Sequence, residues 1–206
     1  MAEYQERSLC FDDIEKGQGY LTSSCVVTGE DVMEFARLTG DHNRLHTDPE
    51  YAKGTAFGEP IAHGLLTLSV ANGLYMQLGL FEEYTVANLG IESWNFKKPV
   101  FFGDSLHVHL QPDGKRQTSD PRRGVIRWKV TVVNQKDEAV ADGIWVKMFL
   151  TRVAVEQKRR NMYESGSSCC RRNENGLRTA GRLSAEFLYH RPVCGGLGVS
   201  ALFERI

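Results

Sequence analysis

The chain has 206 residues, which is enough for one domain or for one domain with an extension. The apolar fraction is 41% and the formal net charge is −1, so no overall charge draws the protein to nucleic acid or to an anionic membrane. No apolar run approaches the roughly 20 residues that a membrane helix needs. The acidic start has the pattern of neither a secretory signal nor an Arg-rich transit peptide. We therefore expect a cytoplasmic protein with no nucleic-acid or membrane partner.

The sequence pattern divides the chain after about residue 153. Residues 1–153 have the periodicity of a folded domain. Residues 154–206 contain clusters of Gly, Ser, Arg and Asn and sustain neither the strand period nor the helix period. We predict that residues 154–206 form a basic, weakly ordered extension, with a functional arm as the alternative.

In chain order, a strand is expected first, at about residues 19–27. A helix then begins at Thr28, where TGED offers a capping box with Asp31, and it ends at Thr39-Gly40. A polar loop leads to a second helix over residues 63–78. This second helix is apolar nearly all round, which is typical of a helix buried on most sides.

Four strand-like runs follow the second helix, at residues 85–96, 105–112, 124–134 and 139–152. Polar and apolar residues alternate most clearly over residues 125–132. Residues 134–137 are expected to form the hairpin turn between the last two strands. The layout predicts an α+β fold in which an antiparallel sheet wraps around one long buried helix.

The loop between the two helices contains the segment GDHNRLHTD, which holds the residues best suited to chemistry. Asp41 and His46 lie five residues apart just after a helix end, so their side chains can converge. Addition of water to an enoyl thioester needs one group that takes a proton from water and a route for a proton to the α-carbon; a His can do either job, and an Asp can hold the water. Asn43 could hold the pair in place without transferring protons. Taken alone, however, an Asp and a His in a polar loop are more often surface residues than catalysts.

The segment PIAHG leads into the second helix and carries the other candidate residues. Amides at a helix start lack intrahelical partners and lie at the positive end of the helix dipole. The Gly64 amide could therefore bind a thioester carbonyl that becomes an enolate oxygen. Alternatively, Gly64 only permits close packing of the first turn. His63, beside Gly64, is a second candidate for substrate binding, with a hydrogen-bonded structural histidine as the favoured alternative.

Three segments together resemble the MaoC-like dehydratases, which include the (R)-specific enoyl-CoA hydratases. The segments are GDHNRLHTD, FGEPIAHGLLTLSV and WNFKKPVFFGDSL, and the similarity extends over about residues 11–152. The resemblance implies a hot-dog fold, with Asp41 and His46 as the catalytic pair and Asn43 as the residue that supports them. It also implies that the Gly64 amide holds the thioester carbonyl.

The same resemblance implies reversible hydration of trans-2-enoyl-CoA to (R)-3-hydroxyacyl-CoA, in a homodimer or larger homo-oligomer. It implies no metal and no organic cofactor, in keeping with the absence of CxxC pairs among the five cysteines. The family usually has Pro where this chain has Arg44, which could contact a CoA phosphate or an acyl carboxylate, or point to water. Lys97 and Lys98 could likewise meet CoA phosphates or lie at a solvated strand end.

Two other functions use the same kind of pocket. A hot-dog thioesterase would attack the carbonyl carbon, but a carboxylate paired with His in this spacing argues against it. A non-catalytic acyl-thioester-binding protein has no need of Asp41, Asn43 and His46. The length and substituents of the acyl chain depend on side chains such as Leu66 and Asn72, which the sequence alone cannot position.

Overall fold

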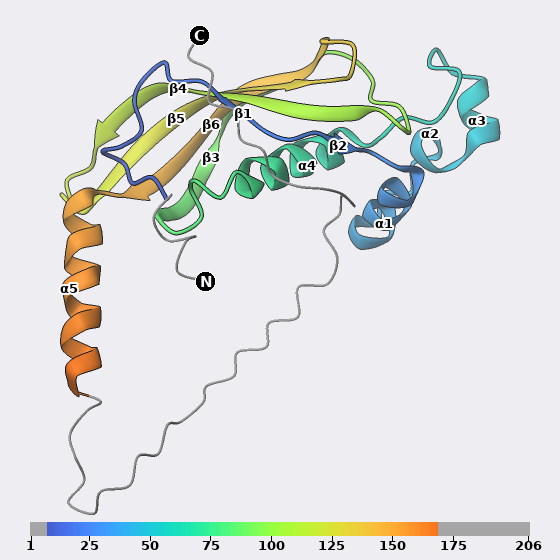
Figure 1. Cartoon of the computed structure of the whole chain (residues 1–206). Coiled ribbons are helices and arrows are strands. Elements are labelled where there is room, and N and C mark those ends of the chain that lie inside the picture. Colours follow the sequence, from blue (N-terminus) through green and yellow to red (C-terminus); the bar gives the residue numbers. More distant parts are fainter. Residues whose placement is uncertain (1–7, 169–206) are drawn as a thin grey trace, which may run out of the picture.

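A curved antiparallel sheet covers one long helix in the computed structural model, which describes residues 8–168 (Figure 1). The elements are β1 (Tyr20–Leu21), β2 (Cys25–Val26), α1 (Gly29–Thr39), α2 (Arg44–Thr47), α3 (Pro49–Lys53), α4 (Gly64–Gln77), β3 (Thr85–Phe96), β4 (Ser105–Gln117), β5 (Arg123–Val133), β6 (Ala139–Leu150) and α5 (Arg152–Ser168). No helix within residues 8–168 is both long enough and apolar enough to cross a membrane. The α+β architecture predicted from the sequence is confirmed.

The strands are ordered β1-β4-β5-β6-β3, and β2 pairs with the same strand, β4, as β1 does. All of these pairings are antiparallel. The four predicted long strands are present, and the expected strand at residues 19–27 is split into two short ones, β1 and β2. Among the described strands β3 pairs only with β6, so its other edge is open. Its exposed apolar side chains are Val86, Leu89, Ile91 and Phe96.

The two ends of α1 are set by the residues that the sequence analysis identified. The Thr28 hydroxyl accepts a hydrogen bond from the Asp31 amide, and the Asp31 carboxylate accepts one from the Thr28 amide, which completes the predicted capping box. At the other end Gly40 has φ 79°, a left-handed conformation that favours glycine. The polar loop therefore leaves α1 in a defined direction.

Helix α4 lies under the concave face of the sheet, with α1, α2 and α3 grouped near its start (Figure 1). Its sheet-facing residues are Leu66, Thr67, Ala71, Leu74 and Tyr75, all buried. The core around them is aromatic: the Tyr75 ring stacks on Phe81 at 4.8 Å and meets Trp128 edge-on at 5.7 Å. The helix is less covered than its apolar sequence predicted, since Leu65 is 60% exposed.

Helix α5 follows the last strand directly and occupies the beginning of the predicted extension. The Asp12 carboxylate accepts a hydrogen bond from the Arg152 amide at 2.7 Å, and Ala154 and Val155 are buried. The sequence pattern missed this helix because the segment is strongly polar and buries only a few residues at its start. The rest of the predicted extension, residues 169–206, lies outside the described residues.

One charged side chain, Lys147, lies in the apolar concave face of the sheet. It is 2% exposed, and its Nζ donates a hydrogen bond to Asn72 Oδ1 at 3.0 Å. The Nζ also lies 4.0 Å from the Tyr75 ring centre and 5.3 Å from that of Trp145. No ion pair within residues 8–168 includes Lys147. Burial without a carboxylate partner lowers the pKa of Lys147 to about 8.

The buried cation predicts a specific dependence of stability on pH. The folded-state pKa of Lys147 is about 8, below the usual 10.5, so the unfolded chain binds more protons between these two values. The free energy of unfolding of the wild type should therefore rise, relative to that of Lys147→Met, by up to about 3 kcal/mol between pH 8 and pH 10.5. Urea unfolding of both proteins across this range measures the difference, and parallel curves would contradict it.

Candidate active site

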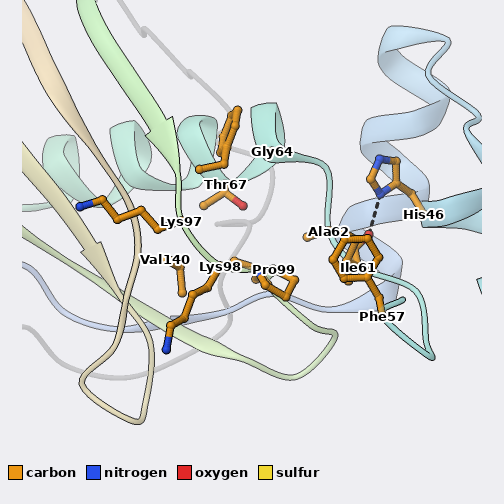
Figure 2. Close-up of a pocket in the computed structure, with 12 residues that line it drawn as sticks. His46, Phe57, Ile61, Ala62, Gly64, Thr67, Lys97, Lys98, Pro99 and Val140 are labelled. Atoms are coloured by element: carbon orange, nitrogen blue, oxygen red, sulfur yellow. Dashed lines mark hydrogen bonds between the residues drawn. The ribbon is translucent and has the colours of Figure 1, made fainter. Parts of the chain in front are cut away.

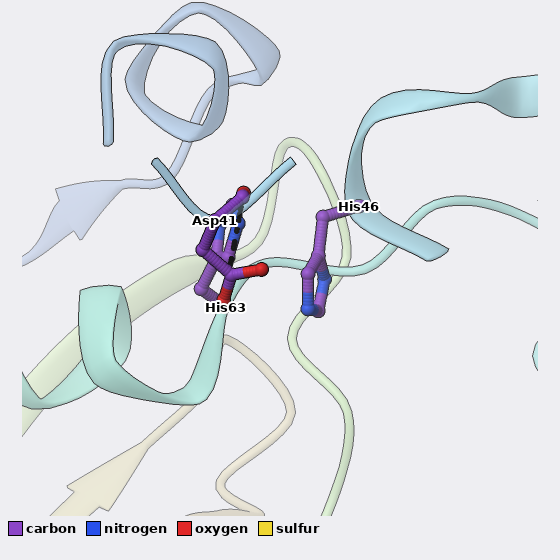
Figure 3. Close-up of side chains that lie close together, drawn as sticks. All are labelled: Asp41, His46 and His63. Carbon is purple, nitrogen blue, oxygen red and sulfur yellow. Dashed lines mark hydrogen bonds and ion pairs between the residues drawn. The ribbon is translucent and has the colours of Figure 1, made fainter. Parts of the chain in front are cut away.

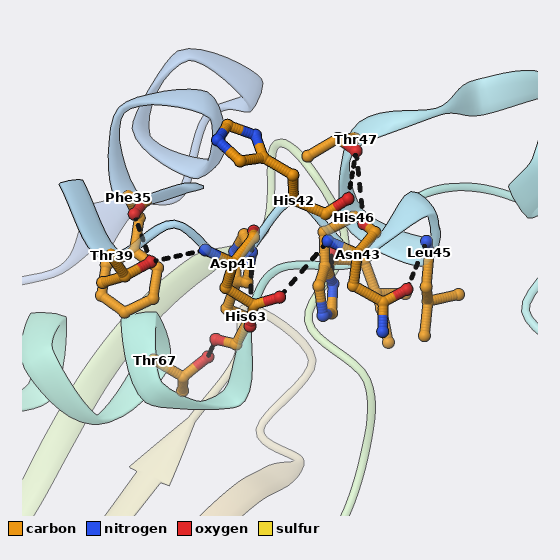
Figure 4. A network of polar contacts seen from close by, with 11 residues as sticks. Phe35, Thr39, Asp41, His42, Asn43, Leu45, His46, Thr47, His63 and Thr67 are labelled. Atoms are coloured by element: carbon orange, nitrogen blue, oxygen red, sulfur yellow. Dashed lines mark hydrogen bonds and ion pairs between the residues drawn. The ribbon is translucent and has the colours of Figure 1, made fainter. Parts of the chain in front are cut away.

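The loop after α1 presents the Asp41 carboxylate at the surface while tying down its backbone. The Asp41 amide donates to Thr39 Oγ1 at 3.3 Å, and that hydroxyl donates to the Phe35 carbonyl at 2.7 Å (Figure 4). The Asp41 side chain is 51% exposed. Its Oδ1 accepts a hydrogen bond from the Asn43 amide at 3.3 Å. The carboxylate is thus held at a fixed backbone position and remains accessible to water.

Asn43 organises the short helix that carries His46. Its Oδ1 accepts a hydrogen bond from the Leu45 amide at 3.0 Å, which caps the start of α2. The two links made by Asn43, one through its amide to Asp41 and one through its side chain to α2, set the spacing between Asp41 and His46.

His46 is oriented by a backbone carbonyl. Its Nδ1 lies 2.7 Å from the Ile61 oxygen, and a carbonyl can only accept, so Nδ1 carries the proton (Figure 2). In the neutral ring this leaves a lone pair on Nε2. His46 also lines the cavity described below. The ring is therefore arranged to accept a proton through Nε2.

The buried side chain of His63 links the start of α4 to the loop that carries Asp41. The side chain is 2% exposed, and its Nε2–H donates to the Asp41 carbonyl at 3.0 Å (Figure 3). Its ring centre lies 4.0 Å from that of His46 and 5.1 Å from that of Phe35. Burial, partly offset by the bond to the Asp41 carbonyl, lowers the pKa of His63. His63 is consequently a buried, neutral histidine that is hydrogen-bonded to the backbone of Asp41.

Gly64 is the first residue of α4 and lies at a close approach. A Cβ at this position would lie 2.7 Å from the Phe96 ring, so a larger residue would force that ring to move. No side chain caps this helix end, and its first amides lack intrahelical acceptors. The start of α4 therefore offers free N–H donors at the positive end of the helix dipole.

A cavity of about 380 Å³ adjoins these groups (Figure 2). Its lining residues are His46, Phe57, Ile61, Ala62, Gly64, Thr67, Phe96, Lys97, Lys98, Pro99, Val100 and Val140. It thus brings His46 and Gly64 to one space, as expected. Asp41 and His63 are not among the lining residues, although each has a polar side-chain atom within 4.8 Å of a ring nitrogen of His46, which does line the cavity.

Each basic side chain discussed for phosphate binding already has an acidic partner. Lys97 pairs with Asp142, and Lys98 Nζ lies 2.6 Å from Glu138 Oε1. Arg44 is mostly exposed; it bonds Asp48 at 2.8 Å and lies over the Tyr51 ring at 4.5 Å. The two lysine pairs were not evident from the sequence, because Asp142 and Glu138 lie at least 40 residues further along the chain. Exposed pairs of this kind are weak and can exchange for other anions.

The carboxylate of Asp41 and one ring nitrogen each of His46 and His63 lie within 4.8 Å of one another. Aspartate and histidine are common zinc ligands, but bond lengths of about 2.1 Å require ligand atoms only ~3.4 Å apart around a tetrahedral ion. His63 Nε2 is also engaged with the Asp41 carbonyl. The three side chains therefore lie close together, and each histidine ring is held by a backbone carbonyl, that of Asp41 for His63 and that of Ile61 for His46.

The family model described as "MaoC like domain" matches residues 13–134. Protein MaoC of Klebsiella aerogenes is 37% identical over 100 residues, which cover 48% of this chain and 29% of that protein. The (R)-specific enoyl-CoA hydratase of Aeromonas caviae is 40% identical over 89 residues, which cover 42% of this chain and 63% of the relative. The chain spans between 11% and 64% of the length of four such curated relatives.

Solved structures agree with these matches. A monoamine oxidase regulatory protein from Archaeoglobus has a TM-score of 0.66 at 34% identity, covering 70% of this chain and 95% of that one. The (R)-hydratase of A. caviae has a TM-score of 0.56 at 30% identity, covering 67% and 98%. A double hot-dog protein from Mycobacterium tuberculosis, at 23% identity and a TM-score of 0.63, covers 71% and 45% and supports the fold alone. The predicted hot-dog fold is thereby confirmed.

The environment of His63 predicts its titration. Because burial penalises the charged ring, His63 should stay neutral below the ordinary pKa near 6.5, with its proton on Nε2. The unfolded chain then binds more protons just below that pH, so acidification through this range should lower the free energy of unfolding. Ring ¹⁵N spectra measure both the tautomer and the pKa, with His63→Gln identifying the signals. A charged His63 at pH 7, or a proton on Nδ1, would contradict this arrangement.

Proposed function

Because the chain belongs to the MaoC-like dehydratase family, we propose that it is an (R)-specific enoyl-CoA hydratase, or 3-hydroxyacyl-CoA dehydratase, that adds water reversibly to trans-2-enoyl-CoA. The observation that carries the proposal is the convergence of His46 and Gly64 on one cavity, with the Asp41 carboxylate close to the His46 ring. These are the three groups that water addition to a thioester requires.

In the proposed reaction the Gly64 amide binds the thioester carbonyl and Asp41 holds the attacking water. The water oxygen bonds to the β-carbon while His46 Nε2 takes one of its protons. The electrons of the double bond move to the carbonyl oxygen, which becomes an enolate stabilised by the N–H donor and the helix dipole. Return of a proton to the α-carbon gives the 3-hydroxyacyl thioester, and dehydration is the reverse.

The remaining residues of the site position these groups. Asn43 keeps α2 and Asp41 in register through its amide and its side chain. The Ile61 carbonyl holds the proton on His46 Nδ1, which keeps Nε2 free to act as a base. His63 fixes the Asp41 backbone and is not among the residues that line the cavity, so we assign it a positioning role in place of the substrate-binding role considered from the sequence.

Substitution of the acid–base pair tests the proposal. Asp41→Asn keeps the backbone carbonyl that His63 needs, and His46→Gln removes the ring base; each should lower turnover ~10²-fold or more. His42→Gln, an exposed neighbour outside the cluster, is the matched control and should keep full activity. Loss of enoyl absorbance and release of free thiol are followed together with trans-2-enoyl-CoA substrates of several lengths.

The outcome separates the proposal from its alternatives. Thiol release without a 3-hydroxyacyl product would replace the hydratase by a thioesterase. Saturable binding with neither product would indicate a binding protein. Near-normal rates in folded Asp41→Asn and His46→Gln variants would mean that other residues carry the reaction.

We also propose that the protein is a homodimer joined along the open edge of β3. A long, exposed apolar edge strand favours pairing with another strand, and Leu89 and Ile91 on this edge are each about half exposed. Size-exclusion chromatography with light scattering should give twice the chain mass. The variant Leu89→Lys/Ile91→Lys should shift toward monomer, whereas Leu38→Lys on α1 should not. A monomeric wild type would contradict the dimer.

A further inference from the structure

A row of aromatic side chains runs from the cavity to the buried lysine. Phe96 lines the cavity, and Trp94 meets it edge-on with ring centres 6.4 Å apart. Trp94 stacks on Trp145 at 5.7 Å, and Lys147 Nζ lies 5.3 Å from the Trp145 ring. The row of packed aromatic rings that begins at the cavity-lining Phe96 therefore ends at an ammonium group.

Helix α4 follows the same direction from its first residue. With 3.6 residues per turn, Gly64, Leu68, Ala71 and Tyr75 lie along one stripe, and Asn72 lies beside it. Asn72 is eight residues beyond Gly64, which corresponds to about 12 Å along the helix axis. The Asn72 side chain accepts the hydrogen bond from Lys147, so helix and sheet are joined by a polar contact at this depth.

The hydrogen bond between Lys147 and Asn72 is an unfavourable environment for the alkyl tail of an acyl chain. A chain that reached it would have to displace Asn72 from the ammonium or lie against a buried charge, and both cost free energy. Within residues 8–168, the groups packed around Lys147 offer no compensating anion. Tyr75 and Asn72 face it from α4, and Trp145 lies beside it on β6. The paired backbone positions are Asn88 on β3 and Ile126 on β5.

We propose that Lys147 and Asn72 close the inner end of the acyl site, so that the substrates are short- and medium-chain acyl thioesters. This inference rests on the proposed function. Because a C–C bond of ~1.5 Å advances an extended zigzag chain by only ~1.25 Å, a length of about 12 Å holds no more than about ten carbons. Lys147 acts here as a specificity residue and takes no part in the proton transfers.

Binding of saturated acyl-CoAs tests the length limit without relying on hydration. Calorimetry should give clear binding of butyryl- and octanoyl-CoA and at least tenfold weaker binding of palmitoyl-CoA, at concentrations below its micelle formation. Lys147→Met, which keeps the side chain's length and removes its charge, should improve palmitoyl-CoA binding at least tenfold and leave butyryl-CoA unchanged. Lys129→Met, an exposed lysine on β5, is the matched control and should change neither.

A pH series separates this role from a purely structural one. In the wild type, the ratio of long-chain to short-chain affinity should rise between pH 7 and pH 9 as Lys147 loses its charge, and in Lys147→Met it should stay flat. A length profile that Lys147→Met leaves unchanged, or equal wild-type binding of butyryl- and palmitoyl-CoA, would overturn the inference. So would tighter binding of an acyl-CoA with a terminal carboxylate than of its methyl-ended counterpart, because the ammonium would then be a binding group.

The two proposals fail in different ways. A length limit without hydration of any enoyl-CoA would overturn the hydratase and leave the closed acyl site standing. Hydration without a length limit would support the hydratase and overturn the closed acyl site. Absence of binding by every acyl-CoA would overturn both.

Discussion

The site depends on one partly buried hydrogen bond, from His63 Nε2–H to the carbonyl of Asp41. It joins residues 22 positions apart, the loop after α1 and the start of α4. A single such bond contributes only about 1 kcal/mol, but breaking it would leave a buried donor unpaired. The bond is supported on one side by the left-handed Gly40 and the Thr39 hydroxyl. Asp41 can therefore expose its carboxylate to water while its backbone stays fixed.

One short segment, residues 61–64, provides the groups that hold His46 and Asp41 and the first amide of α4. The Ile61 carbonyl orients His46, His63 holds Asp41, and Gly64 begins the helix with free amides. This segment is in turn bonded to the connection between β3 and β4. The Ala62 amide donates a hydrogen bond to the Val100 carbonyl, and Ile61 forms a β-bridge with Phe101. The proposed base His46, the Asp41 carboxylate and the Gly64 amide are thus fixed to one another through the backbone, and acid–base catalysis would need such preorganisation.

The sequence predicted correctly those features that depend on contacts between residues close together in the chain. The capping box at Thr28, the stop at Gly40 and the turn at Asn134, with Asp137 at φ 59°, are each set by neighbouring residues. The convergence of His46 and Gly64 could be predicted only because their segments resemble those of the MaoC-like dehydratases. Spacing in the sequence does not by itself show that two loops meet. Helix α5 was missed because its polar sequence is anchored at its start by Asp12, 140 residues away.

The charges around the cavity differ in a way that only the three-dimensional structure reveals. At the mouth, Lys97 and Lys98 each have a carboxylate partner and are well exposed, so these pairs can exchange with solvent ions or with phosphates at little cost. Lys147 has an amide and two aromatic rings for partners, and its burial prevents exchange. In the sequence all three are lysines on or next to strands. Because Lys97 and Lys98 are exposed, their ion pairs can be replaced, whereas the buried Lys147 cannot exchange its partners. The proposed limit on acyl-chain length therefore lies at one end of the aromatic row, and the proposed acid–base pair lies at the other end.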